Sequence, residues 1–368
     1  MYTLSLEILK KCNMDCTYCY LGKKKNDTMP FETAQKAIDL AAHEAVKQND
    51  KKLHIYFIGG EVLLAFDMIK KCCDYAEQIC KQKNLYIVYS TTINGTLLNE
   101  KIIDFFIKKE FDFKVSIDGN RTEHDKNRKY CNGAGSHASL INHLYLIRKY
   151  EEMTGKRVHA AQVICKNTCK DLTKTIKYLY GMGFTFVESA VNLYERWDEA
   201  DLELLFEEIK KAFLFYKELK EKGSKFYWKF VEARIEALYS ESQCFYSCKA
   251  GAAFALVTVD GKIYPCTETD ETVCIGDVDQ GLYVPKIRAF INLENSKNDT
   301  CLNCPVYGHC PACKCIMINY DLYHDFYKVP MVECEMTKYM FQLFNEELSE
   351  GQKTGFQKQY GKGREVIC

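Results

Sequence analysis

Three cysteines near the amino end constrain this chain more than any other feature. Residues 12–19 read CNMDCTYC, so Cys12, Cys16 and Cys19 are separated by three and then by two residues. Loop backbone at this spacing can wrap three sulfurs around one corner of an iron–sulfur cubane, which usually takes four cysteines. No further cysteine follows until Cys72, so one iron would lack a protein ligand and could be chelated by nitrogen and oxygen donors. For the triplet alone, a zinc loop or chance clustering is the alternative interpretation.

Composition indicates the cellular compartment of this chain and the kinds of partner it is expected to have. The chain has 368 residues, enough for one large domain and a smaller one, and its 50 basic residues balance its 50 acidic ones. The net charge therefore gives no sign of a nucleic-acid or membrane partner. The first residues lack a signal peptide, and no apolar run reaches membrane-spanning length. The chain has 20 cysteines. We expect a cytoplasmic protein, in which metal ligation by cysteine is favoured over disulfide bonding.

The first half of the chain alternates between strand and helix patterns. Strands are expected at 4–9, 53–58, 85–92, 111–117, 157–164 and 184–191, and helices at 31–47, 65–82, 99–109, 136–153 and 171–181. Pro30 is well placed to start the first helix. Regular alternation of this kind predicts an α/β fold with a parallel sheet.

Polar motifs follow several of these strands. The cysteine loop follows the first strand, Gly59-Gly60-Glu61 the second and Asn94 the third, and the motif Ser116-Ile117-Asp118-Gly119 spans the end of the fourth. This arrangement resembles the radical S-adenosylmethionine (SAM) superfamily, whose CxxxCxxC motif also carries an aromatic residue where Tyr18 stands. The resemblance implies a partial (β/α)6 TIM-type barrel with its site at the carboxyl ends of the strands. It also implies a [4Fe-4S] cluster on the cysteine triplet, with SAM chelating the open iron.

The same resemblance implies which residues hold SAM. The acid of the GGE stretch would accept from the SAM amino group, and Arg128 would pair with its carboxylate. Val62 departs from the proline common in relatives. A plain turn and a solvated surface arginine are the alternatives for these two motifs. The expected SAM-binding residues are Tyr18, Gly59, Gly60, Glu61, Asn94, Ser116, Asp118 and Arg128.

The second half of the chain is rich in cysteine. Apolar runs on both sides of Asp260-Gly261 predict a hairpin that brings Cys248 close to Cys266. This half resembles the SPASM extension of radical SAM enzymes, which implies two auxiliary [4Fe-4S] clusters and three clusters in all. The resemblance assigns Cys244, Cys248, Cys266 and Cys313 to the first, and Cys301, Cys304, Cys310 and Cys334 to the second. Cys315 could replace Cys313, and Cys274 could replace Cys244. A structural zinc ribbon is the alternative for the cysteines from 301 to 315.

These patterns divide the chain into four predicted parts. We expect a radical SAM barrel at 1–195, bridging helices at 196–243, a SPASM domain at 244–340, and a terminal helix with a polar tail at 341–368.

The resemblance implies an oxidoreductase that cleaves SAM and abstracts a hydrogen atom from a peptide or protein. We expect a peptide maturase that installs a thioether or related crosslink on a ribosomally made peptide. An anaerobic sulfatase maturase forming formylglycine is the alternative, but such enzymes carry an aspartate where Thr267 follows Cys266. Glu268 keeps that alternative open, and no general base is assigned. A non-catalytic iron–sulfur or zinc scaffold is the third interpretation.

Two further partners are expected. The implied chemistry needs an external one-electron donor such as flavodoxin or ferredoxin. Only eleven residues precede Cys12. We therefore expect the barrel, the SPASM surface or a separate leader-binding protein to capture the substrate.

Overall fold

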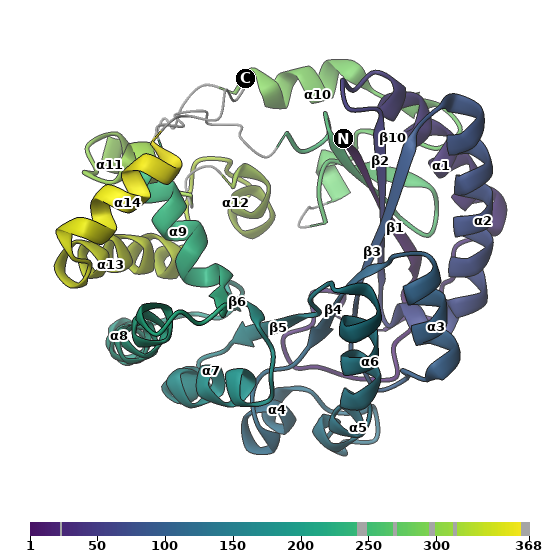
Figure 1. Ribbon diagram of the computed structural model, residues 1–368. Coiled ribbons are helices and arrows are strands. Elements are labelled where there is room, and N and C mark those ends of the chain that lie inside the picture. The colour runs from purple at the N-terminus through teal and green to yellow at the C-terminus, as the bar shows by residue number, and fades with distance from the viewer. Residues whose placement is uncertain (23, 241–248, 268–270, 294–298, 312–314, 362–368) are drawn as a thin grey trace. The chain divides into compact units, whose positions relative to one another are not determined.

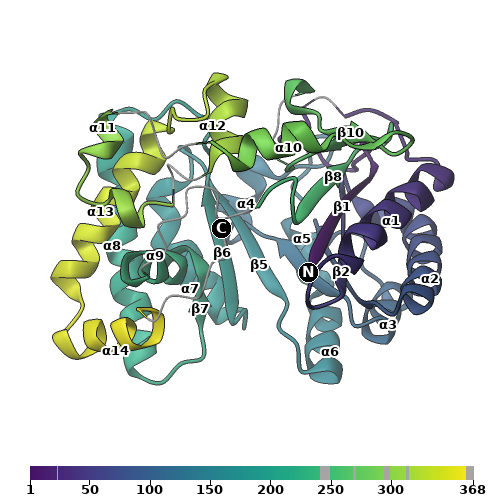
Figure 2. The ribbon, with the colours of Figure 1, turned by 90° about the horizontal axis from the view of Figure 1, so that it is seen from above.

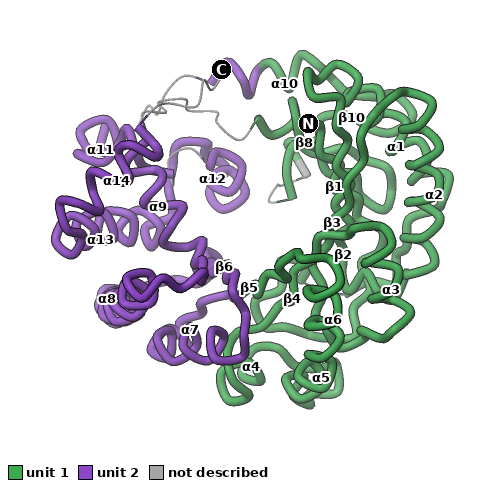
Figure 3. Tube along the Cα trace, viewed as in Figure 1, with its two compact units in different colours: residues 1–161, 249–288 green, residues 162–248, 289–368 purple. Residues whose placement is uncertain are grey.

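The computed structural model describes residues 1–22, 24–240, 249–267, 271–293, 299–311 and 315–361. The chain forms two compact units, shown in different colours in Figure 3. Unit 1 comprises Met1–Ala161 and Lys249–Arg288, and unit 2 comprises Gln162–Cys248 and Ala289–Cys368. The four predicted parts follow motifs rather than these spatial units, and their boundaries stay a prediction.

Unit 1 is built on a mainly parallel sheet. Its strands run in the order β11-β10-β9-β8-β1-β2-β3-β4, and the start of β5 pairs with β4. Strands β8 to β11 are joined in antiparallel fashion, and β8 lies parallel to β1 with Thr3 opposite Phe254. The strands are β1 (Tyr2–Leu9), β2 (Lys52–Gly59), β3 (Tyr86–Ile93), β4 (Asp112–Ser116), β5 (His159–Ile164), β8 (Phe254–Val257), β9 (Lys262–Tyr264), β10 (Gly276–Asp277) and β11 (Gly281–Leu282).

Helices connect the parallel strands of unit 1. Figures 1 and 2 show α1, α2 and α3 on one side of β1, β2 and β3. Helix α1 begins after Pro30, as predicted, and its alanine-rich buried face, with Ala34, Ala37 and Ala41, allows close packing on the sheet. The helical segments are α1 (Phe31–Val46), η1 (Val62–Ala65), α2 (Phe66–Lys83), α3 (Glu100–Lys108), α4 (Arg121–Asn127), α5 (His137–Asn142), α6 (Leu144–Thr154), η3 (Glu271–Val273) and α10 (Val284–Ile291).

The structure confirms the predicted α/β alternation and the predicted hairpin. β8 and β9 pair around Gly261, whose φ of 83° is a conformation that suits glycine. Two details differ. The helix predicted at 136–153 breaks at His143, whose ring nitrogen Nδ1 lies 2.9 Å from the carbonyl oxygen of Gly95. Helix α4 was not predicted, although Asn120 caps it by accepting from the backbone of Thr122 and Glu123.

Unit 2 is mainly helical. β6 (Phe186–Val191) pairs in parallel with the short β7 (Tyr227–Trp228). Helices α8 and α9 lie in the segment 196–243, whose bridging role stays a prediction. A capping box formed by Asp198 and Asp201 starts α8. No helix in the described part of the chain could span a bilayer. The helical segments are η2 (Cys169–Asp171), α7 (Leu172–Gly181), α8 (Glu199–Glu221), α9 (Lys229–Tyr239), α11 (Asp299–Leu302), η4 (Tyr307–His309), α12 (Ile316–Tyr323), α13 (Met331–Glu347) and α14 (Glu350–Tyr360).

Candidate functional site

The cysteine loop leaves the carboxyl end of β1 and is anchored by main-chain hydrogen bonds. The N–H of Asp15 donates to the carbonyl of Lys129 (2.8 Å), and that of Thr17 donates to the carbonyl of Asn127 (3.0 Å). Within the loop, the N–H of Cys19 donates to the carbonyl of Cys16 at 3.1 Å. The loop is therefore fixed both by its own turn and by the segment that ends α4.

The three thiols of the loop are partly exposed and have polar neighbours. The N–H of Met14 donates to Cys12 Sγ at 3.4 Å, and Lys24 Nζ lies 2.5 Å from Cys19 Sγ. Burial raises the pKa of Cys12 to about 11. It also raises the pKa of Cys16, an effect that the nearby Arg128 charge opposes. Because burial outweighs the nearby cations and N–H donors, Cys12 and Cys16 keep their protons near neutral pH, and a bound metal group would replace those protons.

Gly59 and Gly60 let the end of β2 approach the cysteine loop. A Cβ atom on Gly59 would lie 2.1 Å from the carbonyl oxygen of Leu9, and one on Gly60 would lie 2.0 Å from that of Lys11. The N–H of Gly60 donates to Leu9, and the N–H of Glu61 donates to Lys11. Packing against the loop backbone therefore accounts for both glycines, and their role toward SAM stays a prediction.

Glu61 joins the ends of β2 and β3. Its carboxylate is buried and accepts from the N–H of Leu63 (3.1 Å) and of Asn94 (2.7 Å). Burial raises the pKa of Glu61 to about 7, against the opposing effect of these N–H groups and of Arg128. The Asn94 amide in turn donates to the side chain of Asn13 at 2.8 Å. The predicted residues Glu61 and Asn94 are thus tied to each other and to the cysteine loop.

Tyr18, Asp118 and Arg128 form a second polar group beside the loop. The Tyr18 hydroxyl donates to Asp118 Oδ2 at 2.5 Å and accepts from Arg128 Nη1 at 2.8 Å. Asp118 and Arg128 are buried, and Arg128 Nε has no hydrogen-bond partner among the described residues. A buried guanidinium N–H without a partner is uncommon in proteins and is suited to donate to an oxygen of a bound ligand. Arg128 is therefore not the solvated surface side chain of the alternative interpretation.

His124 and Ser136, for which no role is predicted from the sequence, hold this group in place. His124 Nδ1 accepts from the N–H of Asp118 at 3.3 Å, and its Nε2 lies 3.0 Å from Ser136 Oγ. Ser136 Oγ donates to the carbonyl of Arg128 at 2.9 Å. Burial lowers the pKa of His124 to about 2, so the ring is neutral and donates through Nε2. The Asn120 cap and Glu123, three residues later, are the sequence signals that could have revealed this helix.

The remaining predicted residues are Ser116 and the cysteines of the first auxiliary set, and the structure gives fewer contacts for them. Ser116 is the last residue of β4 and pairs with Ala161 of β5. Cys266 follows the hairpin, and Cys274 donates to the carbonyl of Gly276 at 3.3 Å. Cys244, Cys248 and Cys313 lie outside the described residues. The first auxiliary set therefore stays a prediction.

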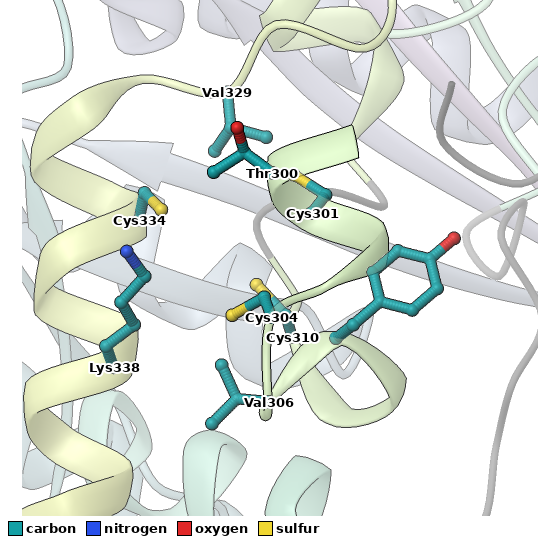
Figure 4. Close-up of a pocket in the computed structure, with 9 residues that line it drawn as sticks. Thr300, Cys301, Cys304, Val306, Cys310, Val329, Cys334 and Lys338 are labelled. Carbon is teal, nitrogen blue, oxygen red and sulfur yellow. The ribbon is translucent and has the colours of Figure 1, made fainter. Parts of the chain in front are cut away.

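The second predicted cysteine set converges on one cavity in unit 2 (Figure 4). Figure 4 shows Cys301, Cys304 and Cys310, on α11 and the turns after it, facing Cys334 on α13. Successive turns shape the first segment, because the N–H of Cys304 donates to Cys301 and that of Cys310 donates to Tyr307. Cys315 lines a different cavity.

Lys338 also belongs to this cavity, although nothing in the sequence pattern predicts it. It lies one helical turn after Cys334 and lines the same cavity. Burial raises the pKa of Cys334 to about 11, and the Lys338 charge opposes that shift. A cation at this wall would offset the negative charge of bound thiolates.

Comparisons with known proteins agree with the site at the level of the superfamily. Residues 6–154 match the profile of the Radical SAM superfamily. The chain is 29% identical to an uncharacterized protein of Methanocaldococcus jannaschii over 78% of this chain and 93% of that protein. It is 25% identical to a cysteine-type anaerobic sulfatase-maturating enzyme of Clostridium perfringens (strain ATCC 13124) over 69% of this chain and 71% of that enzyme.

The fold also has a counterpart among solved structures. Native anSMEcpe with bound AdoMet superposes with a TM-score of 0.79, covering 97% of this chain and 99% of that one at 21% sequence identity. This likeness concerns the fold, and it agrees with the alternation of strands and helices described above.

Proposed function

Because residues 6–154 of this chain form a radical SAM domain, we propose that the protein is a radical SAM peptide maturase. Its substrate would be a ribosomally made, Cys-containing peptide, and its product a thioether or related crosslink. The observation that carries the proposal is a loop with three thiols beside a buried arginine whose Nε has no partner among the described residues.

The residues at the end of β1 fit a [4Fe-4S] cluster with one open iron. Cys12, Cys16 and Cys19 would be its ligands, since three thiols lie on one anchored loop among N–H donors and cations. The cluster with SAM bound supplies the hydrogen-abstracting chemistry characteristic of the superfamily.

The chain's own residues would orient SAM. Arg128 would donate through Nε to the SAM carboxylate while Tyr18 holds its Nη1. Glu61 uses both oxygens to bind backbone N–H groups, and a carboxylate still has lone pairs for an ammonium donor. Gly59, Gly60, Asn94, Ser116 and Asp118 complete the proposed contacts, with the glycines acting through the loop that they support.

Cys301, Cys304, Cys310 and Cys334 would hold one auxiliary cluster. Four thiols face one cavity, which Lys338 also lines. The cysteine triplet at the end of β1 favours an iron–sulfur cluster on these four thiols over the tetrahedral zinc of a ribbon. A second auxiliary cluster on Cys244, Cys248, Cys266 and Cys313 completes the proposal of three clusters.

Thr267 favours the peptide maturase over the sulfatase maturase. It follows the hairpin cysteine directly, and a threonine cannot serve as the carboxylate base that the formylglycine chemistry implies. The alternative retains support from the similarity to the Clostridium enzyme. A cysteine-containing peptide and a sulfatase peptide, offered in parallel, distinguish the two through the mass of the product.

The proposal is tested on protein purified under nitrogen. Reduction with dithionite in the presence of SAM should yield 5′-deoxyadenosine, and roughly twelve irons per chain are expected for three four-iron clusters. Replacing Cys12, Cys16 and Cys19 by alanine should remove about four irons and all SAM cleavage. The matched control is Cys131→Ser, an exposed thiol next to the loop that should leave both unchanged. Three irons or fewer without SAM cleavage would support the scaffold interpretation instead.

A further inference from the structure

A second cavity lies at the carboxyl end of β6, within unit 2. Its volume is about 300 Å³, within the range of small-ligand sites. Ala190 and Val191 of β6, Phe230 of α9 and Ile318 of α12 contribute apolar surface. Its lining shares no residue with the four-cysteine cavity.

One polar wall of this cavity is Asn319, which is fully buried on α12. Its Nδ2 donates to the carbonyl of Phe326 at 3.1 Å, which fixes the orientation of the amide. Its Oδ1 is buried and has no hydrogen-bond partner among the residues that the structure describes. Buried side-chain acceptors are nearly always paired, so this oxygen marks a place for a donor from a ligand.

The other polar wall is Arg234 of α9. Its Nη1 donates to the carbonyl of Phe230 (3.0 Å), and its Nη2 donates to Glu333 (2.7 Å). The guanidinium also stacks on the Phe230 ring, 4.4 Å from the ring centre. Its Nε is buried and unpaired within the described part of the chain. Arg234 and Asn319 therefore both line the cavity, and each carries one buried polar atom without a partner among the described residues, a donor on Arg234 and an acceptor on Asn319.

The charges of the residues that line the cavity indicate whether its ligand is charged or neutral. Glu333 already pairs with Arg234 at 2.7 Å, so the guanidinium is neutralised and the cavity has no net attraction for an anion. Among the described residues of the lining, the buried side-chain atoms without a hydrogen-bond partner are one donor, Arg234 Nε, and one acceptor, Asn319 Oδ1. The main chain of a peptide offers the complementary pair, a C=O acceptor and an N–H donor, without charge.

We propose that this cavity is a substrate subsite that holds the main chain of the peptide. A peptide C=O accepts from Arg234 Nε, a peptide N–H donates to Asn319 Oδ1, and a small or aliphatic side chain packs on Val191 and Ile318. This inference rests on the proposed function, because it assumes that the substrate is a peptide. It adds the residues that recognise the main chain, independently of the side chain that reacts.

The test uses the full-length protein loaded with its clusters and SAM. The probe is a library of acetyl-X-X-Cys-X-X-amide pentapeptides, from which binders are selected anaerobically and measured by fluorescence anisotropy. Ala190→Phe fills the cavity from an exposed position of β6, so the variant should fold normally. We expect the affinity for the selected peptide to weaken by about tenfold or more, because the peptide can no longer form its hydrogen bonds in the cavity. The matched control, Ala200→Phe on the exposed surface of α8, should bind as the wild type does.

A second measurement leaves the protein unchanged. Analogues of the best peptide, each N-methylated at one amide, should reveal one position where methylation weakens binding about tenfold, because that N–H no longer donates to Asn319. Equal binding by the wild type and Ala190→Phe, equal binding by every analogue, or no selected peptide at all would overturn the inference. Conversion of a cysteine-containing peptide by the wild type, read from the mass of the product, separates these outcomes from a failure of the proposed function.

Discussion

Replacing Gly60 by alanine should displace the cysteine loop from the end of β2. The added Cβ would lie 2.0 Å from the carbonyl oxygen of Lys11, where contacts under 3.0 Å are essentially never found. The backbone must therefore move by at least 3.0 − 2.0 = 1.0 Å. Such a shift also breaks the hydrogen bond from Glu61 to Lys11, which is 3.0 Å long. Overpacking and one lost buried hydrogen bond together should lower the free energy of unfolding by about 2–5 kcal/mol.

The assay follows iron content, electron paramagnetic resonance and unfolding in the same preparation. If the loop moves, the variant should lose about four irons, and SAM should no longer perturb the spectrum of the reduced protein. The auxiliary clusters should be retained, because their ligands lie elsewhere in the sequence.

The control for this experiment is Gly181→Ala at the end of α7. A Cβ atom added at this glycine would have no other atom within 4 Å, so stability and iron content should not fall. If Gly60→Ala kept its iron, its SAM-dependent spectrum and its stability, the close approach of β2 to the cysteine loop would not explain why this position requires glycine.

Three further predictions concern single side chains. Cys334→Ser should remove about four irons while leaving 5′-deoxyadenosine formation measurable, and an unchanged iron count would argue against the four-cysteine cluster. Arg128→Lys keeps the positive charge but loses the planar guanidinium with its several N–H donors, so equilibrium dialysis should show that SAM binding is weakened about tenfold. An affinity for SAM equal to that of the wild type would contradict the proposed contact. His124 has a pKa of about 2 in the folded chain against 6.5 when unperturbed, so its contribution is complete above pH 6.5 and is lost as the pH falls. Urea unfolding between pH 7 and pH 5 should show that the free energy of unfolding of the wild type falls by about 1.4 kcal/mol per pH unit below pH 6.5, whereas that of His124→Asn lacks this fall. The same pH dependence of the free energy of unfolding in both proteins would refute the prediction.

Much of the fold could be predicted because its patterns are local. The first strand was expected at 4–9 and is observed at Tyr2–Leu9, and the hairpin around Gly261 follows from turn residues between apolar runs. The break at His143 could not be predicted, because it depends on a hydrogen bond to Gly95, 48 residues away. The two-residue strand β7 is too short to leave a periodic signal.

The candidate site was predictable where function requires rare residues at fixed spacing. The cysteine triplet is such a case. The role of His124 was not predictable, because it arises only when α4 brings the ring to the N–H of Asp118 and to Ser136. The glycines were assigned to SAM, yet their contacts show that the close approach is to the chain's own backbone. Spacing alone does not distinguish these two reasons for a glycine.

The parallel pairing of β8 with β1 has a consequence for biosynthesis. During translation, the strand that carries the cysteine loop leaves the ribosome first, but its neighbour Phe254–Val257 follows some 250 residues later. Until then one edge of β1 stays open, and such an edge can recruit other chains. A truncated gene ending near residue 195 should therefore yield aggregated protein rather than a minimal enzyme, and iron–sulfur loading should await the finished polypeptide.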